Sequence, residues 1–320
     1  MKLEISNKNL PPNIEVSAVS SKNNFGITSL IKKFKLPNLS LNNNFDPLTA
    51  DLVFLALPHG ISQFYVQKFF NKLKIIDLSG DFRLDSKKIF EDNYKIKHIC
   101  SEYLNNFLYG LPEINKEHFI KKKYISIPGC YPTSILLPLI PLLQNKLINT
   151  KDIIIDSKSG YSGAGKKFKM ENIKNSKDYN FYNYSTNNHR HICEIRQELN
   201  KHSQDEVNFS FNPHILPVYR GMMSTIYCTI KNNKNLFELK KILEDYYKNM
   251  LFVKILNDND KADFFEIQNT NNCLIKLYKH SSENKVILVS LIDNLLKGAS
   301  GQAIQCFNLI YGFNENLSLT

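Results

Sequence analysis

The strongest constraint on the fold is the alternation of short apolar runs with helical patterns through the first half of the chain. Apolar, β-rich runs occupy residues 14–19, 51–57, 73–78 and 124–127. Strands that alternate with helices predict a parallel sheet, and the ligands of such sheets lie beyond the carboxyl ends of the strands. These ends are Ser20-Ser21-Lys22, Pro58-His59-Gly60, Ser79-Gly80-Asp81 and Pro128-Gly129-Cys130.

The second half of the chain has a different pattern, with longer strands and few crossovers after a helix predicted at residues 133–145. One amphipathic helix, at residues 236–250, interrupts these strands. The pattern indicates a second domain of α+β type, with a mixed or antiparallel sheet and helices on one face. A final helix at residues 299–311 is expected to pack back on the first domain. The strands are predicted at residues 152–157, 207–211, 223–230, 273–278 and 286–292.

Composition limits the class of protein. With 320 residues and 42% hydrophobic content, the chain is expected to be a two-domain globular enzyme. The most apolar stretch, residues 135–143, is too short to cross a bilayer and contains two prolines. The first residues lack the apolar core of a secretory signal, so we expect a cytoplasmic protein without membrane contact.

Charge and cysteine content narrow the choice further. The formal net charge of +11 comes mostly from scattered lysines, without an arginine-rich stripe interleaved with aromatic residues. We therefore expect no nucleic acid as partner, while a small anionic substrate fits the charge. The six cysteines lie far apart without a Cys-x-x-Cys pair, which predicts free thiols, at most one of them reactive.

Cys130 is the candidate nucleophile. It lies between an apolar strand and an apolar helix, where unpaired N–H groups and the positive end of the helix favour a thiolate. Gly129 would allow a substrate to approach closely, and Pro132 suits a first helical turn. The alternative is a buried structural cysteine.

Thiolate chemistry on a carbonyl needs an acid or base nearby, and histidine has the appropriate pKa. His214 is the chosen candidate, because it leaves a predicted strand between Pro213 and Pro217; a core or surface histidine is the alternative. The segment His189-Arg190-His191-Ile192-Cys193 has zinc-like alternation but no fourth ligand, so no metal is predicted. An anion pocket that uses Arg190 and the imidazoles is favoured over a solvated polar loop.

Two further segments carry candidates for ligand binding. Residues 160–166 nearly spell a nucleotide-binding phosphate loop, but position 167 is Lys and the Mg²⁺-binding hydroxyl is absent. The same glycine-rich turn could still present backbone N–H groups to a carboxylate or phosphate. After the last strand, Asn294 and Lys297 are expected at the mouth of the site, and the small residues that follow are expected to pack a helix closely on the sheet.

A series of motifs extends through nearly the whole chain. Their order and spacing together resemble the N-acetyl-γ-glutamyl-phosphate reductase family of arginine biosynthesis, which shares its fold group with aspartate-semialdehyde and glyceraldehyde-phosphate dehydrogenases. Each motif alone is weak. They are Leu57-Pro58-His59-Gly60, Asp77-Leu78-Ser79-Gly80-Asp81-Phe82-Arg83, Tyr109-Gly110-Leu111-Pro112-Glu113, Pro128-Gly129-Cys130-Tyr131-Pro132-Thr133, Ser159-Gly160-Tyr161-Ser162-Gly163-Ala164-Gly165, His189-Arg190-His191, Pro213-His214, Arg220-Gly221 and Lys297-Gly298-Ala299-Ser300-Gly301-Gln302-Ala303.

The resemblance implies an α/β fold with a Rossmann-type dinucleotide-binding domain, formed by residues 1–129 and 299–320, and an α+β catalytic domain formed by residues 130–298. It also implies an NADP-dependent oxidoreductase of the semialdehyde dehydrogenase type that is a dimer or tetramer. Cys130 would attack the γ-acyl phosphate, phosphate would leave, and NADPH would reduce the thioester with His214 as proton-transfer partner.

The resemblance further assigns binding residues. Contacts to the substrate are expected from Ser162, Gly163 and Ala164, and contacts to its anionic groups from His189, Arg190 and Arg220. The cofactor's 2′-phosphate is expected near Ser21 and Lys22, and its nicotinamide side near Pro58, Ser79 and Asn294.

One departure from the family concerns the first residues. Relatives begin with a strand and a glycine-rich turn for the pyrophosphate, but residues 1–10 contain no glycine. We expect the true start to lie upstream, with the loss of this strand and helix as the alternative. A reductase for aminoadipate phosphate, an aspartate-semialdehyde dehydrogenase and a truncated non-catalytic homologue remain competing hypotheses.

Overall fold

The part of the chain that comes first in the structure forms a parallel four-stranded sheet. The computed structural model describes residues 50–163, 180–231 and 234–319. The strand order is β1-β2-β4-β3, and all three pairings are parallel, as the alternating pattern predicts. The strands are β1 (Leu52–Leu55), β2 (Lys74–Asp77), β3 (Leu108–Tyr109) and β4 (Tyr124–Ser126).

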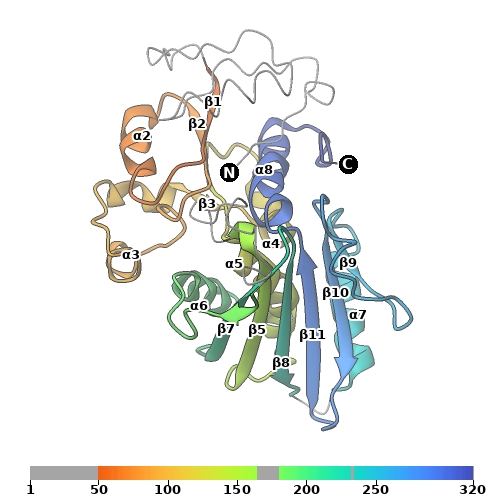
Figure 1. Cartoon of the computed structure of the whole chain (residues 1–320). Helices are drawn as coiled ribbons and strands as arrows, with labels where there is room; N and C mark the ends of the chain where they lie inside the picture. Colours follow the sequence, from red (N-terminus) through yellow and green to blue (C-terminus); the bar gives the residue numbers. More distant parts are fainter. Residues whose placement is uncertain (1–49, 164–179, 232–233, 320) are drawn as a thin grey trace.

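Helices cover both faces of this sheet (Figure 1). Ile75 packs in a cluster with Val66 of helix α2 (Ser62–Phe69), whereas its neighbour Ile76 packs in a second cluster with Cys306 of helix α8 (Gly301–Tyr311). Adjacent residues of a strand point to opposite faces, so both faces of β2 are buried. The shorter helices here are α3 (Lys87–Tyr94), η3 (Ser101–Asn106), α4 (Pro112–Asn115) and η4 (Lys116–His118).

The second sheet has seven strands in the order β6-β7-β5-β8-β11-β10-β9. The pairs β5–β7 and β9–β10 are parallel, and the other neighbours are antiparallel, so the sheet is mixed. This architecture confirms the predicted α/β fold with a second part of α+β type. The strands are β5 (Ile153–Gly160), β6 (Tyr182–Asn183), β7 (Phe209–Leu216), β8 (Met222–Thr229), β9 (Val253–Ile255), β10 (Cys273–Lys279) and β11 (Lys285–Ile292).

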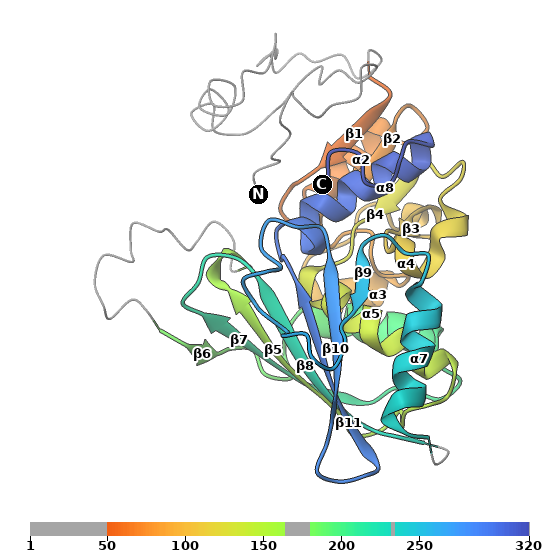
Figure 2. The ribbon, with the colours of Figure 1, turned by 90° about the vertical axis from the view of Figure 1, so that its right-hand side faces the viewer.

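Three helices lie on one face of the second sheet (Figure 2): α5 (Cys130–Gln144), α6 (His191–Lys201) and α7 (Leu236–Tyr247). Side chains of these helices share one hydrophobic cluster with inward-facing residues such as Ile155 and Phe211. Burial alternates along β7 and β8, so the residues between them face the other side of the sheet, where they are only partly buried.

Helix α5 forms the centre of the larger core and begins at Cys130, three residues before the predicted start. Nearly all of its side chains are buried, because it is apolar around its whole circumference. Pro138 and Pro141 lie within it and do not end it. No helix in the described parts of the chain is both long and apolar enough to span a membrane.

One local prediction from the sequence is wrong, and one further segment has a structure that was not predicted. The strand expected to end at residue 211 continues to Leu216, so His214 lies within β7 instead of beyond its end. Pro213 is tolerated inside the strand although it has no N–H, and its carbonyl accepts a hydrogen bond from Tyr184. The segment from His191 is the start of helix α6, not an extended or loop segment, because its apolar residues have helical spacing.

The chain returns from the second sheet to the first through a π-helical turn, Leu296–Ser300. Its wide hydrogen bonds run from Gly298 N–H to the carbonyl of Asp293 and from Ser300 N–H to that of Leu295. Helix α8 follows directly and packs on the parallel sheet, as expected for the final helix. The turn therefore lies where the two sheets meet. Short π segments of this kind occur frequently at functional sites.

Candidate active site

Cys130 lies where β4 ends and α5 begins, beneath the junction of the two sheets. It is partly exposed, whereas the other five cysteines are buried and all six are free thiols. Burial of its surroundings raises the pKa of the thiol, while the Tyr131 backbone N–H, then Arg190 and Arg83, act in the opposite direction. The net effect is opposite to the thiolate stabilisation expected from the helix end alone. The thiol therefore needs a proton acceptor.

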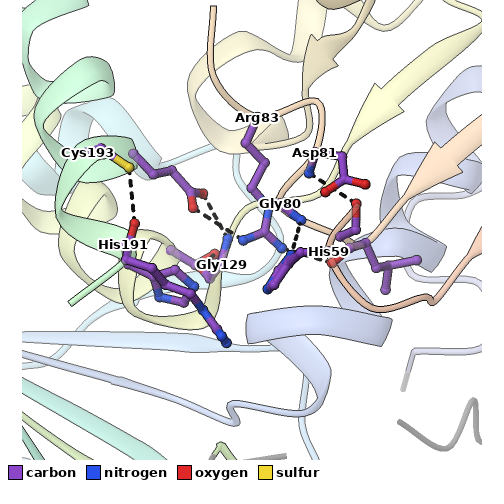
Figure 3. A network of polar contacts seen from close by, with 12 residues as sticks. His59, Gly80, Asp81, Arg83, Gly129, His191 and Cys193 are labelled. Carbon is purple, nitrogen blue, oxygen red and sulfur yellow. Dashed lines mark hydrogen bonds and ion pairs between the residues drawn. The ribbon is translucent and has the colours of Figure 1, made fainter. Parts of the chain in front are cut away.

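The turn that carries Cys130 is fixed by the buried carboxylate of Glu194. Its Oε1 accepts hydrogen bonds from the Gly129 N–H at 2.9 Å and from the Tyr109 hydroxyl at 2.8 Å. Its Oε2 forms an ion pair with Arg83 at 3.3 Å, and both side chains are almost completely buried. Figure 3 shows Arg83 directed toward Gly129. One carboxylate thus joins helix α6 to β3, to the loop after β2 and to the turn before Cys130.

The ring of His191 lies directly over Gly129, the residue before Cys130 (Figure 3). A Cβ on residue 129 would lie 2.6 Å from both Cε1 and Nε2 of the ring, so only glycine fits there. Burial, followed by the positive charges around it, places the pKa of His191 well below its ordinary value. The imidazole is therefore neutral. Its Nδ1 has no hydrogen-bond partner among the described residues.

Tyr131, Tyr184 and His189 form an aromatic wall beside this cysteine. The two tyrosine hydroxyls lie 3.1 Å apart, and the hydroxyl of Tyr184 lies 3.5 Å from Nε2 of His189. The edge of the His189 ring contacts Tyr131. Burial, together with Arg190, lowers the pKa of His189 to about 4. The wall therefore offers uncharged hydrogen-bonding groups to a ligand near Cys130.

The two arginines predicted to bind anions differ in exposure and in their partners. Arg190 is exposed at the start of α6, and its charge lowers the pKa values of Cys130, His59 and His189. It is thus close to the site and accessible to an anion. Arg220 instead forms an ion pair with Asp293, with Nε 2.7 Å from Oδ2, and also donates to Asn269. The guanidinium of Arg220 is thus bound within the protein, where it stabilises the segment between the last strand and the π-helical turn.

The predicted substrate turn is joined to Asn294. Asn294 Nδ2 donates to the hydroxyl of Ser162 at 2.9 Å, and its Oδ1 accepts from the Gly221 N–H at 2.7 Å. Gly163 lies close to Ser159 and Asn294. The side chain of Asn294 is therefore occupied by these loops and is buried. Ala164, the third residue predicted for this turn, lies outside the described residues.

The carboxyl ends of β1 and β2 form the edge expected to bind the cofactor. His59 Nδ1 accepts from the Gly80 N–H at 2.8 Å, and the Asp81 carboxylate accepts from the Gly60 N–H. Pro58 is exposed, but the hydroxyl of Ser79 is buried and turned inward to Asp77 at 2.7 Å. Ser21 and Lys22, expected at the 2′-phosphate, lie outside the described residues.

His59 lies at this edge, close to the turn that carries Cys130. In Figure 3, His59 and Gly80 lie opposite Gly129 and His191, and Gly129 directly precedes Cys130. Burial, then Arg190 and Arg83, lowers the pKa of His59 to about 3, so its imidazole is neutral.

The structure does not bring His214 to Cys130. Phe211 of β7 packs against Tyr131 and His189 on the helix-covered face, and His214, three residues later in an unbroken strand, points to the opposite face. There its Nδ1 lies 3.1 Å from Asp156 Oδ1, and its ring stacks on Phe181. The sheet therefore separates the imidazole of His214 from the thiol.

Comparison with known proteins decides the family. A profile described as "Semialdehyde dehydrogenase, NAD binding domain" matches residues 8–122, and one described as "Semialdehyde dehydrogenase, dimerisation domain" matches residues 130–294. The N-acetyl-γ-glutamyl-phosphate reductase of Clostridium beijerinckii is 41% identical over 309 residues, 95% of this chain and 90% of the relative. That of Ehrlichia canis is 41% identical over 285 residues, 88% and 82% of the two chains. The chain belongs to the N-acetyl-γ-glutamyl-phosphate reductase family.

Membership of this semialdehyde dehydrogenase family makes the chain an oxidoreductase with a domain for a nicotinamide cofactor. Solved structures agree on the fold. Aspartate semialdehyde dehydrogenase II from Vibrio cholerae superposes with a TM-score of 0.64 at 15% identity, over 92% of this chain and 98% of the other. The Candida albicans aspartate semialdehyde dehydrogenase with NADP gives 0.63 at 14% identity, over 97% and 94%.

Sequence reasoning missed the structural importance of Glu194 and His191. Glu194 contacts residues 65, 85 and 111 positions away in the chain, which no local pattern reveals. A usable signal was present, since His191 and Glu194 are three residues apart and therefore lie on one side of a helix. For this segment a zinc site, an anion pocket and a polar loop were weighed from the sequence, but a helix was not.

Proposed function

We propose that this chain reduces N-acetyl-γ-glutamyl phosphate with NADPH to N-acetylglutamate 5-semialdehyde and releases phosphate. The observation that carries the proposal is a partly exposed Cys130 at the start of α5, next to the neutral imidazole of His191. The names of the relatives, at about 40% identity over most of the chain, support the choice of substrate.

The first step is attack by the Cys130 sulfur on the acyl carbon. The thiol loses its proton, a carbon–sulfur bond forms, and the bond from the acyl carbon to the phosphate oxygen breaks. We assign the proton to the His191 imidazole, because it is neutral and lies against Gly129, whereas His214 lies on the far face of the sheet. The role of His214 in proton transfer stays a prediction from sequence, and the variants in the Discussion distinguish the two histidines.

In the second step the thioester on Cys130 is reduced to the semialdehyde. Bound NADPH would supply the hydride for this reduction. As the carbon–sulfur bond breaks, the sulfur leaves as a thiolate and regains a proton from His191, so the chain returns to its starting state. Neither residue is consumed, and phosphate departs before the reduction.

The substrate's anionic groups are assigned to residues around Cys130. Arg190 is exposed and close enough to affect the thiol electrostatically, which suits it to bind the phosphate. His189 offers a neutral hydrogen-bonding ring beside it. We also assign Ser162, Gly163 and Ala164 to the substrate, and Arg220 acts by holding Asp293 and the loops nearby.

The nicotinamide is assigned to the edge formed by Pro58 and Ser79, with Asn294 completing the loops opposite. In the free protein the hydroxyl and the N–H of Ser79 both donate to the carboxylate of Asp77. Preference for NADP over NAD, with Ser21 and Lys22 at the 2′-phosphate, is part of the proposal. A domain division at residues 1–129 with 299–320 and 130–298, a homo-oligomer and a cytoplasmic location complete it.

The test is the reverse reaction of the purified protein. N-acetylglutamate semialdehyde and phosphate should together reduce NADP⁺, and Cys130→Ser should abolish the reaction. Faster turnover of aspartate semialdehyde or aminoadipate semialdehyde would instead assign a neighbouring specificity, because one methylene changes such a rate only by about 10- to 200-fold. A folded protein that turns over none of the three would support a non-catalytic homologue.

A further inference from the structure

A buried ion pair between Lys297 and Glu113 takes no part in the reaction proposed above. The exposed fractions of the two side chains are 0% and 1%, and Lys297 Nζ lies 2.5 Å from Glu113 Oε1. Gln305 completes the cluster, because it accepts from Nζ at 2.7 Å and donates to the same carboxylate oxygen at 2.7 Å. Lys297 was expected at the mouth of the site, but it is completely buried.

The cluster ties together three separate parts of the chain. Glu113 belongs to α4, beside the parallel sheet; Lys297 belongs to the π-helical turn; and Gln305 belongs to α8. A second contact runs parallel to it, since Gln302 Nε2 donates to the carbonyl of Gly110 at 2.8 Å. The π-helical turn and the start of α8 are thus both tied to the segment Gly110–Glu113 beside the parallel sheet.

The other side of the same turn contacts the proposed nucleophile. A Cβ on Gly298 would lie 2.7 Å from the Cβ of Cys130 and 3.2 Å from its Cα. Gly298 is adjacent to Lys297, and its N–H is bonded to the carbonyl of Asp293. A displacement of the turn therefore moves the backbone against which Cys130 packs.

Stability alone is a weak reason for such a pair. Removing two charges from water costs about as much as their attraction returns, and apolar replacements of buried pairs are often neutral or stabilising. An ion pair does, however, impose one geometry that apolar side chains would not. We propose that Lys297 and Glu113 are positioning residues, which hold the π-helical turn against Cys130 and so fix the sulfur relative to the substrate carbonyl. This inference rests on the proposed role of Cys130.

The experiment compares single and double variants of the full-length protein. Lys297→Met and Glu113→Leu each leave one buried charge without its partner, whereas the double variant removes both. Lys276→Met is the matched control, because Lys276 is another buried lysine, bonded to the carbonyls of Asp258 and Asp260. The measurements are Tm, kcat, KM and the rate at which iodoacetamide modifies Cys130, followed by peptide mass spectrometry.

If the pair positions Cys130, the single variants lose stability and the double variant regains the wild-type Tm. Its kcat stays roughly 10²-fold low, its KM changes by less than about twofold, and alkylation of Cys130 changes in rate. Lys276→Met keeps the wild-type kcat. Recovery of both Tm and kcat in the double variant would overturn the proposal, because the pair would then serve stability alone.

A second variant covers the case in which the double variant does not fold. Glu113→Asp keeps both charges but shortens the carboxylate arm by one methylene, so the turn must shift. A folded Glu113→Asp protein should have a lower kcat, and an unchanged kcat would overturn the proposal. If the wild-type protein itself shows no turnover, the proposed function fails, and the alkylation rates of Cys130 still decide whether the pair positions the thiol.

Discussion

The imidazole of His191 covers the Cα of Gly129 so closely that no side chain fits between them. The N–H of the same glycine donates to Glu194, which lies one helical turn beyond His191 in α6. Helix α6 therefore contacts the turn before Cys130 at two points, through the ring of His191 and through the carboxylate of Glu194. These two contacts fix the position of the Cys130 thiol relative to His191, its proposed base.

The variant Gly129→Ala should move the imidazole of His191 away from the turn that carries Cys130. The added Cβ would lie 2.6 Å from the His191 ring, so the ring must move away. We expect kcat to fall roughly 10²-fold and the free energy of unfolding to fall by about 1–3 kcal/mol. Gly312→Ala is the control, because Gly312 has a positive φ of 71° but nothing within 4 Å of a Cβ. Gly312→Ala should lower the free energy of unfolding by about 1 kcal/mol and leave kcat unchanged. A wild-type kcat in Gly129→Ala would contradict the assignment of His191.

Two histidine variants distinguish the candidates for proton transfer. His191→Asn should lower kcat by about 10²- to 10⁴-fold, because the neutral imidazole beside Gly129 is lost. His214→Asn should leave kcat near the wild-type value, since this ring pairs with Asp156 on the opposite face of the sheet. Steady-state rates across the pH range measure both. The reverse result would restore His214 to the role that the sequence suggested.

The two sheets and the position of Cys130 were predictable, because they depend on local patterns. Alternating apolar runs predicted β1, β2 and β4, whereas the run at residues 14–19 lies outside the described residues and β3 was not predicted. The glycine, the proline and the apolar run around Cys130 placed it at the start of a helix. These patterns extend over a few residues, so they can be recognised in a single sequence.

The partners of Cys130 were not predictable by the same means. His214 was chosen because prolines flank it, but β7 continues through Pro213 and turns the ring away. The contacts of Glu194 and the burial of Lys297 arise when segments about 65 to 190 residues apart pack together. Long-range packing of this kind leaves no periodic trace in the sequence.

His59 should make the protein sensitive to acid. Its pKa is about 3 in the folded chain against an ordinary value of 6.5. Between these values the unfolded chain binds a proton that the folded chain does not, so stability rises with pH across this window and is lost as pH falls from 6.5 toward 3. At pH 5 the loss is at most about 2 kcal/mol.

His59→Asn removes this titration while its side-chain oxygen can still accept from the Gly80 N–H. Urea unfolding at pH 7 and pH 5 should therefore show a smaller difference in free energy for the variant than for the wild-type protein. His189, with a folded pKa of about 4, contributes in the same direction and should keep part of the difference in place. An equal difference in the two proteins would show that His59 is not the group responsible.

Glu194→Gln tests how the charge of the buried carboxylate acts on the nucleophile. The amide oxygen can still accept from Gly129 and Tyr109, so the turn should be retained, whereas the negative charge that raises the pKa of Cys130 is removed. The rate at which iodoacetamide alkylates Cys130 rises with pH as the thiolate forms. The midpoint of this pH dependence should consequently shift to lower pH. Glu198→Gln, one turn further along α6, is the matched control and should not shift it, since Glu198 is not among the charges that act on the thiol. If the midpoint in Glu194→Gln instead moved upward, the variant would have displaced Arg83, whose positive charge favours the thiolate, and the carboxylate would act chiefly by holding that arginine in place.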